Sequence, residues 1–572
     1  MEQRTLIAVV LSILVLVVFQ YFFVPDQPVP PQGTQSTQNQ EGTKPQGATQ
    51  DRQQEGQTGQ AAGGNGASSA SGAGALNKEA QQNVLKSALP ASLPPSAAGG
   101  RSIRIETSLY SAEFTEMGGA VKGFVLKKYK KDLDDDSPGI NLVNVSPPLL
   151  PLGLKIGSAT TLDLRSYHFK SPAPSLIELK APGEEAKLEF VADLGDGAVL
   201  RKVFTIKNDS YYIHMTLALE NAGAGNYSIL LYNRPFKEDN RYIFTGPSYY
   251  AAGSLNEVKL DKTGESLEFS GNVDWLSYGD NYFMTAVIPE LTQGPWNLKF
   301  TKLADDGLTE SAMAHAIAPD RTSPLIADMG LYFGPKEIER LKAVGHNLAS
   351  AINFGWFDPI AKPLLYLLNF LNRYLHNYGV AIIVLTILIK LAFWPLAQKS
   401  AKSMKTMQKL QPKLQKLKEK YGDDKERLNK ELMQLYRTYK VNPMSGCLPM
   451  IIQIPVFFAL YKVLLMAIEL RHAPFALWIN DLSAPDRLMI PGVEIPMLGG
   501  IPVLTLLMGA SMWLQQKMSP TSMDPTQAKM MQFLPVIFTF MFINFPSGLV
   551  LYWLVNNILS IVQQYYVNKF TD

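Results

Sequence analysis

Long apolar runs alternate with polar stretches along this chain, and their lengths divide it into regions. Leu6 to Val24 is nearly all apolar and long enough to cross a bilayer. A cleaved signal peptide would need a shorter apolar core followed by small residues. Here the run ends in the bulky residues Tyr21, Phe22 and Phe23. We therefore expect an uncleaved N-terminal signal-anchor helix over residues 1–25.

Residues 26–100 are rich in Gln, Gly, Ala, Ser and Pro and contain few large apolar residues. Such a segment cannot bury enough apolar surface to offset its ordering entropy, so a disordered tether is predicted. From Ile103 the pattern changes to a period of two, most clearly over Tyr212 to Glu220, and similar short runs recur to about Leu331. This spacing predicts a soluble antiparallel β-sandwich over residues 101–350. Some large β-sandwiches bind or isomerise sugars, but no constellation of carboxylates and histidines supports that alternative in the sequence.

Residues 356–377 form an amphipathic pattern, with apolar residues at helical spacing and Lys362 and Arg373 on the other side. The apolar set is Ile360, Leu364, Leu367, Leu368, Leu371 and Leu375. Trp356, Tyr366 and Tyr374 are residue types that anchor helices at a membrane interface. The pattern predicts a helix on the outer membrane surface, and the alternative is a helix buried under the β-domain.

Gly379 to Leu396 is apolar enough to enter a bilayer, yet it contains Lys390. A lysine at the centre of a spanning helix costs about 2.5–3.5 kcal/mol, which favours a wet cavity facing its ammonium. The alternative is that Lys390 snorkels to the membrane surface, because Pro395 and the helix end are close. Thr386 lies one turn earlier on the same face and favours the cavity.

The pattern over residues 398–445 predicts a polar helical hairpin. In it Gly422 ends the first helix, and Asp423 and Asp424 begin the second. The hairpin has thirteen basic residues against five acidic ones. Six of its lysines step by three and four along one helix: Lys402, Lys405, Lys409, Lys413, Lys416 and Lys420. They form either an ordinary solvated face or a docking surface for anionic lipid or ribosomal RNA.

Four further apolar stretches follow the hairpin, and with residues 379–396 they predict a five-helix transmembrane bundle within residues 379–572. They are Cys447 to Ala467, Ile501 to Gln516, Met530 to Phe545, and Leu549 to Tyr565. Basic residues concentrate on the hairpin side of these spans. The positive-inside rule then places the hairpin and both termini in the cytoplasm and the β-domain outside. The predicted fold class is an α+β membrane protein.

Polar residues recur inside the predicted spans. Tyr552, Asn556, Ser560 and Gln563 step by four, four and three along the last span, and Gln453 interrupts an earlier one. Such residues either join helices by hydrogen bonds or, together with Thr386 and Lys390, wall one hydrated groove.

Composition narrows the function. The formal charge of +3 over 572 residues gives no reason to expect a DNA partner. Cys447 is the single cysteine and the six histidines show no ligand spacing, so neither a metal site nor a cofactor is predicted. No nucleophile and base lie together in the spans, so no catalytic residue is predicted and the protein is not expected to be an enzyme. A secondary transporter or ion-coupled carrier using Lys390 stays open as an alternative, although the spans show no inverted repeat.

Several longer motifs carry a family resemblance. They are YFGPKE from Tyr332, NPMSGCLPMIIQIPVFFALYKVL from Asn442, APFALWINDLSAPD from Ala473, QKMSPTSMDPTQAKMMQFLPVIFTFMF from Gln516 and FPSGLVLYWLVNN from Phe545. In these motifs the chain resembles the YidC/Oxa/Alb family of membrane protein insertases, in its Gram-negative form with a large periplasmic domain. The resemblance covers nearly the whole chain except the tether.

The resemblance implies a multi-pass protein of the bacterial inner membrane that inserts and folds nascent membrane proteins, alone or with the SecYEG translocon and its accessory proteins. It implies a hydrophilic groove in which Lys390 stands where the family usually has arginine; lysine keeps the charge but lacks the planar fork. It also places Thr386, Tyr552 and Trp553 near the substrate path. The hairpin would receive the substrate and the ribosome.

Overall fold

The computed structural model describes most of the chain from Gly100 onward: residues 100–157, 162–195, 197–221, 225–234, 243–290, 295–317, 325–422, 424–439, 448–490, 492, 498–518 and 525–570. The predicted signal anchor (1–25), nearly all of the predicted tether (26–100) and Cys447 lie outside the described residues.

Strands fill the described chain from Ser102 to Pro335. They are β1 (Ser102–Glu106), β2 (Tyr110–Thr115), β3 (Ala120–Lys130), β4 (Gly139–Asn141), β5 (Gly153–Ile156), β6 (Leu162–Asp163), β7 (Leu176–Glu178), β8 (Glu185–Gly195), β9 (Ala198–Lys207), β10 (Tyr212–Glu220), β11 (Gly225–Asn233), β12 (Gly246–Ala251), β13 (Ser254–Glu257), β14 (Ser266–Gly271), β15 (Val273–Gly279), β16 (Phe283–Pro289), β17 (Trp296–Lys302), β18 (Thr309–Ile317) and β19 (Leu325–Pro335).

These strands form two packed layers. One layer is an eight-stranded sheet with the order β13-β12-β15-β16-β19-β10-β9-β8. The other consists of a five-stranded sheet, β4-β3-β2-β1-β7, and a six-stranded sheet, β14-β17-β18-β11-β5-β6. Both smaller sheets cover the same face of the large one: Phe114 packs on Phe204 at 5.0 Å between ring centroids, and Phe300 packs on Tyr249 at 5.7 Å. Pairing is antiparallel throughout except that β1 and β7 run parallel, a departure from the predicted all-antiparallel sandwich.

The alternating sequence over β10 explains its place between these layers. Its buried residues are Ile213, Met215, Leu217 and Leu219, and the residues between them are half-buried on the opposite face. Successive side chains of a strand point to opposite faces, so the period of two predicts one covered face, and the structure confirms it.

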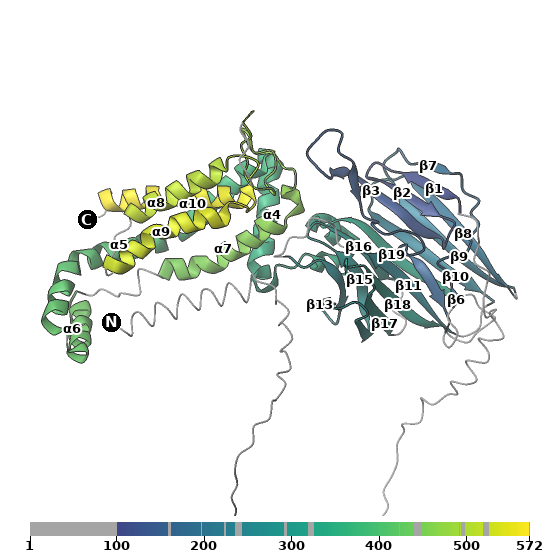
Figure 1. Ribbon diagram of the computed structural model, residues 1–572, viewed down its shortest axis with the longest axis horizontal. Helices are drawn as coiled ribbons and strands as arrows, with labels where there is room; N and C mark the ends of the chain where they lie inside the picture. Colours follow the sequence, from purple (N-terminus) through teal and green to yellow (C-terminus); the bar gives the residue numbers. More distant parts are fainter. Residues whose placement is uncertain are drawn as a thin grey trace, which may run out of the picture.

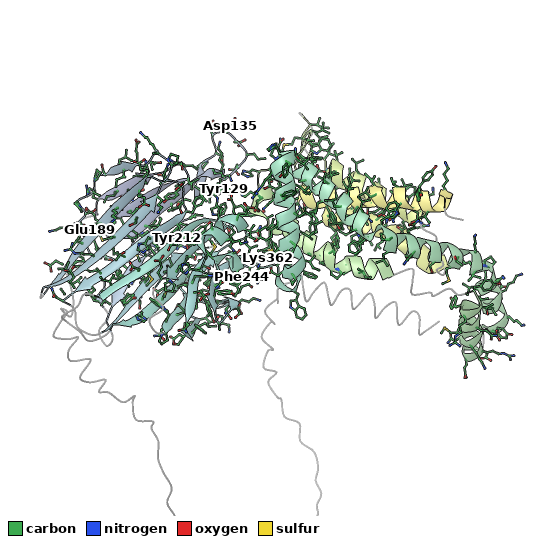
Figure 2. The ribbon with its side chains drawn as sticks, turned by 180° about the vertical axis from the view of Figure 1, so that it is seen from behind. Tyr129, Asp135, Glu189, Tyr212, Phe244 and Lys362 are labelled. Carbon is green, nitrogen blue, oxygen red and sulfur yellow. The ribbon has the colours of Figure 1, made fainter. Side chains whose placement is uncertain are left out.

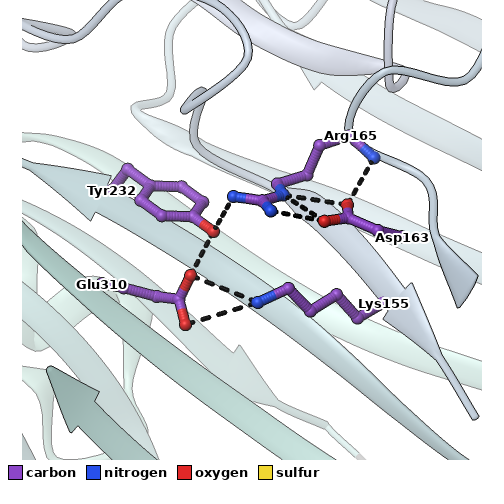
Figure 3. A network of polar contacts seen from close by, with 5 residues as sticks. All are labelled: Lys155, Asp163, Arg165, Tyr232 and Glu310. Carbon is purple, nitrogen blue, oxygen red and sulfur yellow. Dashed lines mark hydrogen bonds and ion pairs between the residues drawn. The ribbon is translucent and has the colours of Figure 1, made fainter. Parts of the chain in front are cut away.

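Two polar clusters fix loops of the β-domain (the strands from Ser102 to Pro335). Figure 3 shows Arg165 bound to Asp163 and, through Nη1, to the hydroxyl of Tyr232 at 2.7 Å. Tyr232 in turn bonds to Glu310, which pairs with Lys155 at 3.3 Å. The chain joins β5 and β6 to β11 and β18, so it holds the edge of the six-stranded sheet.

The second cluster is built around Lys202 of β9, which points into the core. It is 1% exposed, and its ammonium donates to the carbonyls of Gly118 and Leu152 at 2.8 Å and of Gly119 at 3.2 Å. One side chain therefore binds two loops of the other layer to the large sheet.

Helices follow the strands. They are α3 (Ile338–Val344), α4 (Asp358–Leu375), α5 (Tyr378–Tyr421), α6 (Lys425–Thr438), α7 (Leu448–Met466), α8 (Val503–Met518), α9 (Pro525–Phe542) and α10 (Ser547–Phe570), with short 3-10 turns η1 (Leu348–Ala351), η2 (Gly355–Phe357) and η4 (Ile468–Leu470). Figure 1 shows the β-domain at one end of the helices and α6 at the other, with α4 lying crosswise between the β-domain and the bundle (α5 and α7 to α10).

The predicted hairpin differs from the structure at its first boundary. α5 runs unbroken from Tyr378 to Tyr421, so the lysine-bearing apolar segment and the first hairpin helix are one helix of 44 residues. Pro395 lies inside it rather than ending it. The second boundary agrees with the prediction, because the side chain of Asp424 caps α6 by accepting from the amide of Arg427.

Within the described chain, only Tyr378–Ser400 combines the length and the hydropathy of a membrane span. Ile452–Met466 and Gln532–Phe542 are apolar but shorter. A β-rich domain followed by a helical region is therefore established, whereas the five transmembrane passes stay a prediction.

The β-domain contacts the bundle through specific polar bonds. The side-chain amide of Asn281, in the turn between β15 and β16, donates to the carbonyl of Leu465 at 3.2 Å. Arg471 donates to the carbonyls of Lys130 at 2.8 Å and Lys131 at 3.2 Å. Figure 2 shows Tyr129 and Asp135 on the side of the β-domain that faces the helices.

Candidate functional site

A chain of polar side chains crosses the inside of the bundle. The ammonium of Lys390 in α5 donates to the hydroxyl of Ser560 in α10 at 2.8 Å. The hydroxyl of Ser560 donates to the carbonyl of Asn556 at 2.7 Å, and the amide of Gln453 in α7 donates to the side chain of Asn556 at 3.4 Å. We call Lys390, Ser560, Asn556 and Gln453 the polar seam, because it joins three helices of the bundle.

Lys390 is half-buried, and among the described residues no Asp or Glu forms an ion pair with it. The described parts of α5 before residue 419, α7, α8, α9 and α10 contain no acidic residue. An ammonium held away from water without an opposite charge is costly. The seam is therefore suited to attract an anionic or carbonyl oxygen.

Neighbouring polar residues of α10 have a different use. Asn557 donates to the hydroxyl of Ser511 in α8 at 3.0 Å, and Gln564 donates to the carbonyl of Met518 at the end of α8 at 3.4 Å. These two residues, seven apart, bind α10 to α8. Asn556, Ser560 and Gln563 lie on the side rotated away from α8. Asn557 and Gln564 thus join α10 to α8, and Ser560 and Asn556 join it to α5 and α7. A hydrated groove along Asn556 and Ser560 stays a prediction.

Tyr552 and Trp553 belong to an aromatic layer nearer the β-domain. Trp553 packs on Phe542 at 4.5 Å and on Phe457 at 4.9 Å between ring centroids. Tyr552, only 2% exposed, packs on Phe457 at 6.0 Å. Eight residues of helix separate Tyr552 from Ser560, or about 12 Å. The structure therefore puts these two predicted residues in a packed layer next to the seam, not in the seam itself.

Thr386 is buried, and its hydroxyl donates to the carbonyl of Ile382 one turn earlier at 2.7 Å. It shares this packed part of α5 with Ile382 and Leu385, both fully buried. The sequence places Thr386 on the face of Lys390, but its printed hydrogen bond is within α5 rather than to the seam.

The loop after η4 closes the bundle at the β-domain end. Asp486, 2% exposed, accepts from the indole of Trp478 at 2.6 Å and from the amide of Thr505 at 3.3 Å in the first turn of α8. Phe475 packs so tightly on Gly379 that a Cβ there would lie 2.0 Å from its ring. Packed loop residues therefore lie at the β-domain end of the bundle. Asp486 was not singled out from the sequence.

Four of the six predicted hairpin lysines have described side chains, and all four are exposed: Lys409, Lys413, Lys416 and Lys420. The side chains of Lys402 and Lys405 lie outside the described residues. The ammonium of Lys413 bonds to the hydroxyl of Tyr439 and lies 4.5 Å from its ring centroid, which ties α5 to the end of α6. Leu410 and Leu432 are buried between the two helices. The lysine row thus forms an exposed basic face of a packed hairpin.

Two further ionisable residues were not predicted. Glu469 in η4 accepts from the side-chain amide of Asn369 in α4 at 3.2 Å, and burial raises the pKa of its carboxyl to about 7. Lys462 is half-buried near the end of α7, where the negative charge of Glu257 acts on it. Each is a single charged residue near the end of an apolar run, so no repeated spacing of polar residues indicated a functional role for it.

No group of three or more His, Cys, Asp or Glu in the described chain is arranged to hold a metal ion. The polar seam contains hydrogen-bond donors and one positive charge, which suit an oxygen-bearing ligand.

Comparisons with known proteins agree with this division of the chain. Residues 102–367 match the family model described as YidC periplasmic domain, and residues 370–572 match the one described as 60Kd inner membrane protein. The chain is 41% identical to the membrane protein insertase YidC of Pelobacter propionicus and 41% identical to that of Syntrophus aciditrophicus, in each case over 100% of both chains. A crystal structure of an active YidC insertase covers 85% of this chain and 96% of its own at 19% identity, with a TM-score of 0.36.

The fold and the two matched regions define an inner-membrane protein with a periplasmic β-domain joined to a helical membrane region. Identity of about two residues in five over the full length of these relatives goes further. The chain belongs to the YidC family of membrane protein insertases.

Proposed function

We propose that this chain inserts newly made membrane proteins into the bacterial inner membrane, and that the polar seam of α5, α7 and α10 takes the polar segment of the incoming chain. The observation that carries the proposal is the bond of Lys390 to Ser560 inside a bundle without acidic residues in its described spans. The relatives reported above carry the name membrane protein insertase. No covalent chemistry is needed for such a function.

The physical task is to spare a polar segment the cost of entering hydrocarbon, where an unpaired amide costs about 4–8 kcal/mol. The seam offers replacement partners. A lysine ammonium has three donor protons, and Ser560 accepts one of them. The other protons and the positive charge attract acidic side chains and carbonyl oxygens of the substrate. On this account the charge is essential and the planar fork of an arginine is not.

The arrangement of the ends fits an inward-facing groove. Asp486, Trp478 and Phe475 pack the β-domain end, while α6 lies at the opposite end of the bundle. We infer that the hairpin and both termini are cytoplasmic and that the β-domain is periplasmic, as the distribution of basic residues indicates. The exposed lysines of the hairpin then face the ribosome and anionic lipid, and the SecYEG translocon and its accessory proteins are expected partners.

A transporter or ion-coupled carrier was the alternative for Lys390. The relatives are named insertases and give it no support. The seam also lacks a second ionisable group among the described residues, which a proton relay through the bundle would use.

The proposal is tested by reconstituting the full chain in vesicles and measuring protease protection of a single-span substrate whose translocated tail contains Asp. Lys390→Arg is expected to insert like wild type, Lys390→Ala at least tenfold more slowly, and Lys390→Glu not at all. Lys399→Ala, an exposed lysine further along α5, is the matched control. Normal insertion by both Lys390→Ala and Lys390→Glu would refute the proposal.

A further inference from the structure

Gln563 is a polar residue of α10 that takes part in none of the interactions described so far. Its side-chain amide nitrogen is buried and has no hydrogen-bond partner among the described residues. Buried amide donors are nearly always paired, because an unpaired one loses its bonds to water without replacement. A donor kept in this condition requires an explanation, and a transient ligand is one.

The position of Gln563 is fixed by contacts on either side of it. Three residues before it, Ser560 binds Lys390 of α5 at 2.8 Å. Three residues after it, Tyr566 packs on Trp394 of α5 at 6.2 Å between ring centroids. Residues three apart on a helix are neighbours on one face. Gln563 therefore lies along the line where α10 meets α5, about one turn from the lysine contact.

The adjacent residue Gln564 makes the helix-to-helix hydrogen bond that Gln563 lacks. Gln564 donates to the carbonyl of Met518 and so holds α10 to α8. Successive residues of a helix are rotated by about 100°, which turns Gln563 away from α8. Of these two adjacent glutamines, Gln564 thus donates a hydrogen bond within the fold and Gln563 does not.

We propose that Gln563 donates its amide hydrogen to a backbone carbonyl of the translocating segment, next to the place where Lys390 takes acidic groups. The proposal rests on the insertase function and adds the class of substrate group that the seam recognises. A neutral amide donor is suited to a neutral acceptor, whereas the ammonium is suited to carboxylates. Every substrate has backbone carbonyls, so Gln563 makes part of the recognition independent of substrate charge.

The test combines two positions with two substrates in reconstituted vesicles. One substrate has Asp residues in its translocated tail and the other has an uncharged tail of equal length. Gln563→Met, which keeps the length and removes the donor, is expected to slow both substrates equally, by about five- to tenfold for one lost hydrogen bond. Lys390→Ala is expected to slow the acidic substrate far more than the uncharged one.

Gln564→Met is the matched control, because it removes the same amide one position away. It is expected to lower the thermal unfolding temperature of the purified chain while leaving the ratio of the two insertion rates unchanged. Gln563→Met is expected to leave the unfolding temperature within about a degree or two of wild type, since its donor has no partner to lose.

A direct readout is a photo-crosslinking residue at position 563 with ribosome-bound nascent chains. We expect crosslinks to the translocated segment from 563 and not from Val562, which is 55% exposed on the outer face of the bundle. If Gln563→Met slowed only the acidic substrate, the ligand would be a carboxylate and the proposal would be wrong. No effect on either substrate, or no crosslink, would also overturn it, while the effects of Lys390 variants would still decide the proposed function separately.

Discussion

The guanidinium of Arg471 donates to the backbone carbonyl of Lys130 at 2.8 Å, so one side chain of the bundle loop holds the end of β3 in the β-domain. A second bond from Arg471 reaches the carbonyl of Lys131 at 3.2 Å, and its guanidinium lies 5.9 Å from the ring centroid of Phe283. With the bond from Asn281 to Leu465, these contacts fix the β-domain against the bundle at two separate strand ends.

The first prediction concerns this junction. Arg471→Ala removes two donors to carbonyls, and we expect the distance distribution between spin labels on the β-domain and on α8 to broaden. The expected loss of stability is small, about 1–2 kcal/mol. Arg104→Ala, an exposed arginine on β1, is the control and should leave the distribution unchanged. An unaltered distribution in Arg471→Ala would show that the apolar contacts alone fix the domains.

The second prediction is a pH dependence that Glu469 introduces. Burial raises the pKa of its carboxyl from 4.5 to about 7; Asn369 and Lys128 oppose the shift and the negative charge of Glu337 adds to it. Between these two pH values the folded chain binds more protons than the unfolded chain, so stability falls as pH rises through the window. We expect Glu469→Gln to match wild type near pH 5 and to exceed it by up to about 3 kcal/mol at pH 8.

Thermal unfolding of both proteins in detergent from pH 5 to 8.5 measures this difference. Asn369→Ala should make the stability depend on pH more steeply than in the wild type, because it removes the hydrogen-bond donor to the carboxylate of Glu469. A constant difference between Glu469→Gln and wild type across the range would contradict the prediction.

The third prediction concerns Lys202. Burial lowers the pKa of its ammonium from 10.5 to about 7, so the unfolded chain binds more protons between these values and stability rises with pH across them. Lys202→Met removes the hydrogen bonds of this side chain to backbone carbonyls: three from the ammonium, and two from the neutral amine that prevails in the folded chain at pH 9. We expect the free energy of unfolding of the variant to be about 2–4 kcal/mol below that of the wild type at pH 9. The difference becomes smaller toward pH 7, where the wild type must bury a charged ammonium.

Hydrogen exchange of the amides in β8 to β10 of the full chain reports on this loss. Lys187→Met, at an exposed position of β8, is the control. Unchanged protection in Lys202→Met would mean that the loops at Gly118 and Leu152 are held by other contacts.

The fourth prediction tests whether the seam is wet. A cysteine placed at Asn556, in a variant with Cys447 replaced by Ser, is expected to react with a water-soluble thiol reagent added from the cytoplasmic side. Cysteine at Asn557, which is 3% exposed and faces Ser511, should react far more slowly. Equal and slow labelling at both positions would show that the seam is dry packing.

The sequence predicted the strands from local alternation and grouped Lys390, Asn556 and Ser560 as candidate residues from helical spacing, but it did not pair Lys390 with Ser560. Alternation over β10 fixes its covered face. Asn556 and Ser560 share one face of α10 because they are four residues apart. It could not predict that Thr386 satisfies its hydroxyl within α5, since that depends on which rotamer the packing selects.

Long-range charge clusters were also missed. His214 in β10 lies 3.2 Å from Glu290 and 3.6 Å from Asp328, although no pairing of histidine with carboxylates was expected in the β-domain. The three residues are far apart in the chain. They meet through the registers of β19 with β10 and with β16, which periodicity alone does not fix.

The continuity of α5 has a mechanical consequence. Thirty-one residues of one helix connect Lys390 to Tyr421, with Pro395 and Pro412 between them, a path of about 46 Å along the helix. A partner that binds the basic end of α5 therefore acts on the same helix that carries Lys390, whose ammonium donates to Ser560 of α10. Tilting of α5 by a partner bound at the hairpin would therefore strain the bond between Lys390 and Ser560, which in our proposal the substrate replaces.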